Sequence, residues 1–171
     1  VIDVKQESCI ATFAAKWAGS KVFSRSLPDY KGYRAGSYDD RALVADLHKL
    51  LDEADIVVAH NGDAFDLKVI QGRFIFHGMC PPSPYKTIDT KKAAKKVGRF
   101  SSNKLDDLGK HLGEGKKIKT DFELWLGCMA GDAKAWEKMV RYNEQDVVLL
   151  EKVYLRLRPF MSPHPNLAAW A

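Results

Sequence analysis

The amino-acid sequence predicts an α/β fold in which helices flank a partly antiparallel sheet. Short apolar stretches typical of strands cluster in the first half of the chain, and amphipathic helical patterns dominate the second half. The chain has 171 residues, 46% of them hydrophobic and 29% charged, which is typical of a folded protein with its own core. It shows no internal repeat and no linker, so we expect residues 1–171 to form a single domain.

The composition narrows the classes of protein to consider. The formal net charge of +5 is compatible with a polyanionic partner but does not establish one. No apolar run approaches the roughly 20 residues of a membrane span, so we expect no membrane partner. No secretory signal is recognisable in the first residues, although the chain begins with Val1. The three cysteines have no metal-ligand spacing, which argues against a disulfide scaffold or a zinc site and favours the cytoplasm: Cys9, Cys80 and Cys128.

A β-hairpin is predicted near the N-terminus. Residues 9–17 have the composition of a strand, and residues 21–23 are its expected partner across a turn at residues 18–20. Residues 1–4 are interpreted as a further short strand that carries one carboxylate, Asp3. Residues 27–38 are rich in Gly, Tyr and Ser and are expected to form a loop.

A helix, a buried strand and a second helix are predicted next. Asp39 or Asp40 can cap the first helix. Residues 56–60 form an apolar run typical of a buried strand, and the following turn delivers Asp66 at the start of the second helix, which ends near Gly78. The apolar faces of the two helices are expected to contain Leu43, Val44, Leu47, Leu50 and Leu51 in the first and Val69, Ile70 and Phe74 in the second.

The second half is predicted to be mainly helical. Residues 85–89 form one more short strand, which ends in Asp89 and leads into a basic helix. Ser101 and Ser102 are expected to cap the helix after it, and residues 113–120 form a flexible basic loop. From residue 121 to the last arginines the pattern is helical, with Gly127 and Gly131 as interruptions, and the tail from residue 159 is expected to be irregular.

Asp66 and Asp146 are candidate metal ligands because they are carboxylates on two separate elements. Mg²⁺ and Mn²⁺ prefer oxygen ligands, and two such ions about 3.5–4 Å apart stabilise the attacking and leaving oxygens of a phosphodiester displacement. Tyr142 lies one helical turn before Asp146 and could orient the attacking water. The alternative is that Asp66 is a charge at a helix N-terminus and Asp146 a solvated helix position.

Two motifs make the chain similar to a known family. The N-x-x-x-F-D pattern from Asn61 to Asp66 resembles the second motif of the DEDD 3′–5′ exonucleases, and the Y-x-x-x-D pattern from Tyr142 to Asp146 resembles the third motif of the tyrosine-bearing DEDDy branch. From Cys9 to Arg158 the chain resembles a subgroup of predicted exonucleases related to polymerase proofreading domains. The stretches that carry this likeness are F-A-A-K-W, H-N-G-D-x-F-D, Y-K-T-I-D-T, S-N-K-L-D and R-Y-x-x-Q-D-V.

The resemblance implies an RNase H-like fold, with a mixed central sheet flanked by helices, and removal of nucleotides from a single-stranded DNA or RNA 3′ end with two Mg²⁺ or Mn²⁺ ions. Carried over by position, Asp66 and Asp146 would be metal ligands, Tyr142 the residue that orients water, and Asn61 a residue that shapes the turn. Asp89 would bond to the metal ligands without touching the ions itself, or else it would cap a helix at the surface. A polymerase or a helicase is the candidate partner protein.

The first motif departs from the family pattern. A D-x-E pair is expected on the central strand, and Asp3 is the candidate Asp, but Lys5 stands where the Glu is expected. Either residues 1–4 are that strand and the Glu is lost, or the first motif lies upstream of Val1. We favour Asp3 as the third metal ligand, because a sheet without its central strand exposes its core. With this motif incomplete, we expect the chain as given to be weakly active or inactive.

Basic residues offer a candidate track for a phosphate backbone, although a solvated helix face is the ordinary interpretation. Asn103 and Lys104 start a helix whose free N–H groups could bind phosphate. The basic residues of the track are Lys91, Lys92, Lys95, Lys96, Arg99, Lys104, Lys116, Lys117 and Lys119. The aromatic residues that could stack on bases or else pack in the core are Tyr38, Tyr85 and Phe100.

His60 is interpreted as a hydrogen-bonded structural residue, and Trp125, Trp136, Met129 and Met139 as packing residues. Two other functions are kept beside the exonuclease. One is a nucleic-acid-binding module of the same fold without catalysis, and the other is an RNase H-like endonuclease.

Overall fold

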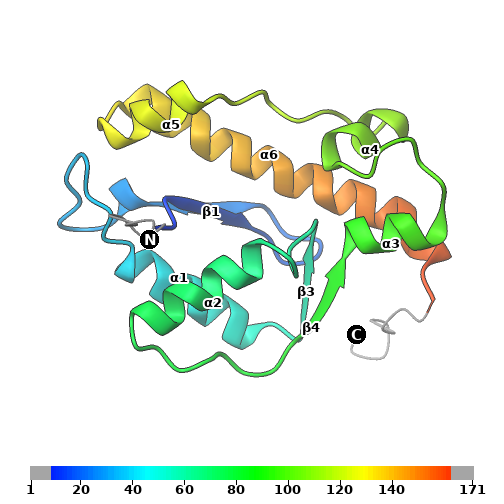
Figure 1. The fold of residues 1–171 in the computed structure, drawn as a ribbon, viewed down its shortest axis with the longest axis horizontal. Helices are drawn as coiled ribbons and strands as arrows, with labels where there is room; N and C mark the ends of the chain where they lie inside the picture. Colours follow the sequence, from blue (N-terminus) through cyan, green and yellow to red (C-terminus); the bar gives the residue numbers. More distant parts are fainter. Residues whose placement is uncertain (1–8, 163–171) are drawn as a thin grey trace, which may run out of the picture.

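The strands lie between two layers of helices in the computed structural model, which describes residues 9–162 (Figure 1). One layer contains α6 (Ala133–Leu157), the longest helix, with α5 (Phe122–Met129) and α4 (Leu105–His111). The other contains α1 (Arg41–Glu53) and α2 (Asp66–Phe76). The predicted α/β class is confirmed, and Asp3 lies outside the described residues.

The strands form two pairs. Strand β1 (Thr12–Ala15) is antiparallel to β2 (Phe23–Ser26), and β3 (Ile56–Ala59) is parallel to β4 (Lys86–Asp89). Among residues 9–162 the two pairs remain separate two-stranded sheets, so the mixed pairing is present but the single continuous sheet is not. All residues of β1 and β3 are only half-buried, because each of these strands has a hydrogen-bonded neighbour on one side alone in this part of the chain. The strand predicted at residues 56–60 is therefore present as β3, but it is half-buried instead of buried.

The N-terminal hairpin is confirmed, but its loop is longer than predicted. Ala15 pairs with Phe23, so the connecting segment is residues 16–22 instead of residues 18–20. The Ser20 amide donates to the Trp17 carbonyl at 3.0 Å, and Gly19 takes a left-handed conformation with φ of 73°. This turn lies at residues 17–20, where the sequence predicts a turn, but the strands begin to pair only at Ala15 and Phe23, so residues 16–17 and 21–22 belong to the loop and not to the predicted strands.

Helices α1 and α2 have the apolar faces that the sequence predicts. Helix α2 ends at Phe76, and Gly78 just beyond its cap has a φ of 66°, which allows the Met79 amide to donate to the Phe74 carbonyl at 2.9 Å. The buried apolar residues of the two helices are Leu43, Val44, Leu47 and Leu51 in α1 and Phe74 in α2, while Leu50, Val69 and Ile70 are half-buried.

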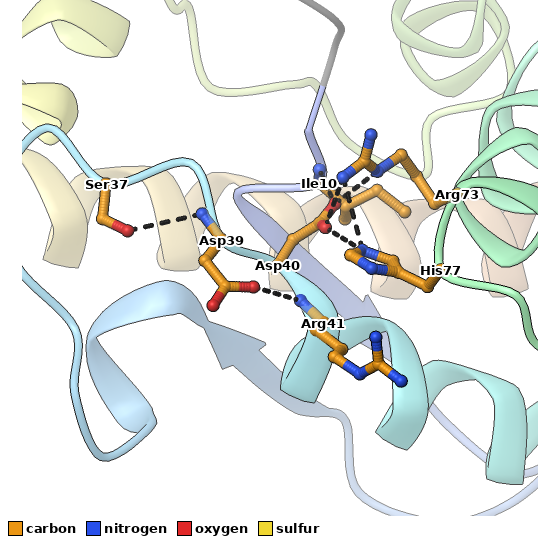
Figure 2. A network of polar contacts seen from close by, with 7 residues as sticks. All are labelled: Ile10, Ser37, Asp39, Asp40, Arg41, Arg73 and His77. Atoms are coloured by element: carbon orange, nitrogen blue, oxygen red, sulfur yellow. Dashed lines mark hydrogen bonds and ion pairs between the residues drawn. The ribbon is translucent and has the colours of Figure 1, made fainter.

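Asp40 makes a buried ion network instead of a helix cap (Figure 2). The cap bond comes from its neighbour, because the Arg41 amide donates to Asp39 Oδ1 at 3.1 Å. The Asp40 carboxylate is fully buried and accepts from the Ile10 amide at 2.8 Å and from Arg73 Nε and Nη2 at 2.9 and 2.7 Å.

The same carboxylate lies 2.6 Å from His77 Nε2. Burial by itself would raise the pKa of Asp40, but the bonds from Arg73, Ile10 and His77 outweigh it and hold the pKa below its ordinary value. Because Arg73 and His77 belong to α2 and its C-terminal cap, Asp40 fixes the helix that begins with Asp66.

Helix α6 is the element against which most of the structure packs. It contacts β1, β2, α5, α4 and α3 (Thr90–Val97). Trp136 is buried and its Nε1 donates to Tyr33 Oη at 3.1 Å, so the predicted packing role is confirmed. Met129 is also buried, while Trp125 and Met139 pack on the same apolar cluster.

Two details of the C-terminal half differ from the sequence pattern. Gly127 lies inside α5 and does not interrupt it; the break before α6 occurs at residues 130–132, where Gly131 has a φ of 84°. Short 3₁₀ helices occupy Leu27–Asp29 within the predicted loop and Arg158–Phe160 in the predicted irregular tail. Across residues 9–162, no helix is both long enough and apolar enough to cross a membrane.

Candidate metal and nucleic-acid site

The carboxyl ends of β3 and β4 lie side by side, because Ala59 pairs with Asp89 in the parallel ladder. The turn after β3 is tight: Asn61 adopts a left-handed conformation with φ of 64°, and a Cβ on Gly62 would lie 2.4 Å from the Ala59 Cβ. This turn leads directly into Asp66, the first residue of α2. The predicted strand–turn–helix unit is therefore confirmed, and it brings the candidate carboxylate to the end of the parallel pair.

Asp89 is a helix cap that is buried instead of lying at the surface. Its Oδ1 accepts from the amides of Asn61 and Lys91 at 2.9 Å and of Lys92 at 3.3 Å, so one oxygen both caps α3 and holds the turn after β3. Its exposed fraction is 7%, and among the described residues its Oδ2 has no hydrogen-bond partner. A buried carboxylate oxygen without a partner calls for a cation or a water molecule.

His60 has the structural role that the sequence predicts. Its Nδ1 lies 2.9 Å from Thr90 Oγ1 and its Nε2 lies 3.0 Å from the Asn103 carbonyl oxygen. Burial lowers the pKa of His60, and the bond to Asn103 opposes that shift. The ring thereby ties the loop before α4 to the end of β3. Within residues 9–162, Asn103 Oδ1 is also buried without a hydrogen-bond partner.

Tyr142 and Asp146 share one face of α6, as the spacing predicts, because both contact the same side chain. Lys117 Nζ lies 2.5 Å from Asp146 Oδ2 and 5.0 Å from the centre of the Tyr142 ring. The other oxygen of this carboxylate, Asp146 Oδ1, is buried and has no partner in the described part of the chain.

Asp66 belongs to the same electrostatic cluster although much of the residue is exposed. Partial burial raises the pKa of its carboxyl group, the positive charge of Lys117 opposes the rise, and the negative charge of Asp89 adds to it. The charges of these residues therefore act on one another. Asp66 senses Asp89 and Lys117, and Lys117 is paired with Asp146.

Lys117 is the residue that sequence reasoning missed. The sequence assigns it to a basic track together with its exposed neighbours, and nothing in the G-K-K-I-K stretch distinguishes it. Burial alone would lower the pKa of Lys117, but bonds to Asp146 and Tyr142 outweigh burial and raise the pKa above its ordinary value. The ammonium group is therefore held charged between candidate metal ligands.

In the part of the chain that the structure describes, the unpartnered oxygen atoms of these residues are of the kind that a divalent metal ion binds. Three buried side-chain polar atoms lack a hydrogen-bond partner in the described chain, and all three are oxygens of this cluster: Asp89 Oδ2, Asn103 Oδ1 and Asp146 Oδ1. In residues 9–162, no three His, Cys, Asp or Glu side chains converge closely enough to hold a metal ion by themselves. Mg²⁺ is commonly held by only one or two carboxylates together with substrate phosphates, so this donor set suits it.

The basic residues near the cluster are partly engaged. Lys91 Nζ donates to Asn61 Oδ1 at 3.3 Å, and Lys92 Nζ pairs with Asp63 at 2.7 Å. Lys95 and Lys104 are exposed, and Lys104 is the N-terminal cap residue of α4. The expected serine cap of α4 is wrong, because Ser101 and Ser102 lie before the cap position and the cap makes no side-chain bond.

The candidate base-stacking aromatic residues favour the packing alternative. Tyr38, Tyr85 and Phe100 are half-buried and each packs against a different apolar cluster. A base could reach them only if these clusters opened, so we do not assign them to the site.

Comparison with known protein families matches residues 5–158 to a family described as the RNase_H superfamily. The matched segment includes every residue of the cluster from His60 to Asp146. A search of the curated proteins finds no match.

Proposed function

We propose that the chain, which belongs to the RNase H superfamily, is a 3′–5′ exonuclease of the DEDDy type. Membership of this superfamily indicates a metal-dependent nuclease, and the proposal proceeds from that premise. The substrate would be the 3′ end of a single-stranded DNA or RNA. The observation that carries the proposal is a set of three buried oxygens without hydrogen-bond partners among the described residues: Asp89 Oδ2 at the end of β4, Asn103 Oδ1 in the loop bonded to His60, and Asp146 Oδ1 on α6, one turn from Tyr142.

The roles of the residues follow from their positions. Asp66 and Asp146 would hold the divalent ions, which supply charge stabilisation for the attacking and leaving oxygens when bound. Tyr142 and Asp146 both contact the Lys117 ammonium, and we propose that the Tyr142 phenol orients the attacking water molecule there. Asn61 keeps the turn after β3 tight and holds Asp89 through its amide.

Substrate binding is assigned to the basic residues around this edge. Lys91 and Lys95 lie on α3, directly after Asp89, and Lys104 lies at the start of α4 next to Asn103. We propose that they contact the phosphate backbone, which would make binding depend on salt concentration but not on sequence.

The trimming of a labelled single strand tests the proposal. A version of the protein with an intact first motif, incubated with Mn²⁺, should shorten a 5′-labelled oligonucleotide one nucleotide at a time from its 3′ end, and a chelator should stop the reaction. Asp146→Asn should abolish trimming, and the exposed Asp121, which caps α5, provides a matched Asp→Asn control that should remain active. Undiminished trimming by Asp146→Asn would refute the assignment. Cleavage of a circular single strand would indicate the endonuclease instead.

A second function, a nucleic-acid-binding module without catalysis, is favoured by one observation. The cation found against Asp146 is the Lys117 ammonium, and residues 9–162 contain no three-ligand metal cluster. Binding of a single-stranded oligonucleotide without cleavage at saturating Mn²⁺ would support the module. Asp146→Asn would then leave oligonucleotide binding intact.

A further inference from the structure

Lys117 is a lysine inside an acidic cluster, and its place is built by the surrounding backbone. The Lys117 amide donates to Asp106 Oδ1 on α4 at 2.8 Å, and Gln145 Nε2 on α6 donates to the Lys116 carbonyl at 2.8 Å. The loop before it is closed by the Glu114 amide, which donates to the Gly109 carbonyl at 2.8 Å. The backbone of Lys117 is thus fastened to two helices.

The side chain of Lys117, in contrast, is partly open to solvent. It retains 29% exposure, and its ammonium is carried on a stem with four rotatable bonds. Its contacts at that end are Asp146 Oδ2, at 2.5 Å, and the face of Tyr142. With its backbone anchored and its side chain long and partly exposed, Lys117 can place its ammonium on a second anion without moving the loop.

The Lys117 ammonium lies against the carboxylate oxygen that a divalent ion bound to Asp146 would need as a ligand. It uses one oxygen of Asp146 and leaves the other, Oδ1, buried without a partner in the described chain. Its charge also acts on Asp66, the other candidate ligand. A divalent ion at these carboxylates would repel an ammonium a few ångströms away, so the two cations cannot both remain there.

We propose that Lys117 is the resident counter-ion of the metal-free site, and that a divalent cation displaces its ammonium from Asp146 onto a phosphate oxygen of the bound strand. This inference rests on the proposed function. Phosphate is the receiving group because lysine binds it as a point charge and because the strand must bring a phosphate to the same ions. Lys117 is then a substrate-binding residue whose availability depends on the metal.

The test measures two affinities that change in opposite directions. Lys117→Met removes the competitor, so Mn²⁺ should bind about three- to tenfold more tightly in a calorimetric titration. With Ca²⁺ present, the same variant should bind a fluorescent single-stranded oligonucleotide more weakly, and the dependence of log affinity on log salt should lose about one unit of slope. A lysine with only a structural role would weaken both affinities when removed.

Two further variants serve as controls. Lys134→Met removes the same charge from an exposed position on α6, outside the basic track, and should leave Mn²⁺ affinity unchanged. Lys117→Arg keeps the charge and should restore both affinities toward the wild-type values, and far-ultraviolet circular dichroism verifies that each variant is folded.

Each other outcome refutes a defined part of the account. If wild type binds Mn²⁺ and Lys117→Met binds it no more tightly, the counter-ion role is wrong while the proposed function stands. If Lys117→Met binds Mn²⁺ and wild type does not, the lysine replaces the ion permanently and the exchange is wrong. If neither protein binds Mn²⁺, the proposed function itself is wrong.

Discussion

Replacing Asp40 by Asn should destabilise the protein more than any other single polar change that we consider. Its carboxylate has no exposed surface and receives the Ile10 amide, two nitrogens of Arg73 and the close approach of His77 (Figure 2). Asn preserves the shape of the side chain but removes the negative charge against which the Arg73 guanidinium is buried. The NH₂ group of Asn can only donate hydrogen bonds, and it would face the Ile10 amide or the Arg73 guanidinium, which are themselves donors.

The expected loss follows from this geometry. Removing one partner from a buried ion pair costs about 3–5 kcal/mol, because the other charge stays buried. Asn retains one oxygen that can still accept the bond from the Ile10 amide, so we expect the lower end of that range, about 3 kcal/mol. That loss is a large part of the total stability of an ordinary domain.

Urea unfolding followed by circular dichroism measures the loss. Asp40→Asn should shift the midpoint to lower urea with an unchanged slope. Asp39→Asn is the matched control: Asp39 is exposed and makes one cap bond at 3.1 Å, so its replacement should cost at most about 1 kcal/mol. A loss below about 1 kcal/mol for Asp40→Asn would refute the view that this network fixes α2.

Three further predictions concern pH and the turns that shape the site. Folding lowers the pKa of Asp40 below its ordinary value of 3.8, so the stability that its carboxylate contributes is lost only in acid. The difference in free energy of unfolding between wild type and Asp40→Asn should be constant at neutral pH and should shrink as pH falls below 3.8. Urea unfolding at several pH values measures it. Gly109→Ala should lower the free energy of unfolding by about 1–3 kcal/mol, because its Cβ would lie 2.8 Å from both the Gly115 carbonyl oxygen and Leu149 Cδ1; an unchanged thermal midpoint would contradict this packing. Asn61→Ala should cost about 1 kcal/mol, since alanine disfavours φ of 64°, whereas Asn61→Gly should be nearly neutral in the same unfolding assay.

The local parts of the structure could be predicted from the sequence. An apolar run followed by Asn61 and Gly62 predicts a strand and a tight turn, and the structure has both. The spacing of Tyr142 and Asp146 predicts one helix face, and both residues contact Lys117. These features depend on neighbours within a few residues, which propensity and periodicity describe.

The parts that depend on distant partners could not be predicted. Asp39 and Asp40 are equivalent as sequence caps, and only the approach of Arg73 decides that Asp40 is the buried one. Lys117 resembles its neighbours until Asp106 and Gln145 fix the loop around it. The separation of the strands into two pairs likewise reflects which strands find partners across the fold, which a local pattern does not record.

The most direct measurement of the central claim is a crystal structure of the protein with Mn²⁺, with the ion located by its anomalous scattering. The account predicts Mn²⁺ bound to the carboxylates of Asp66 and Asp146, with the Lys117 ammonium moved away from Asp146 Oδ2. A structure at saturating Mn²⁺ that contains no ion at these carboxylates and retains the Lys117–Asp146 ion pair would contradict it.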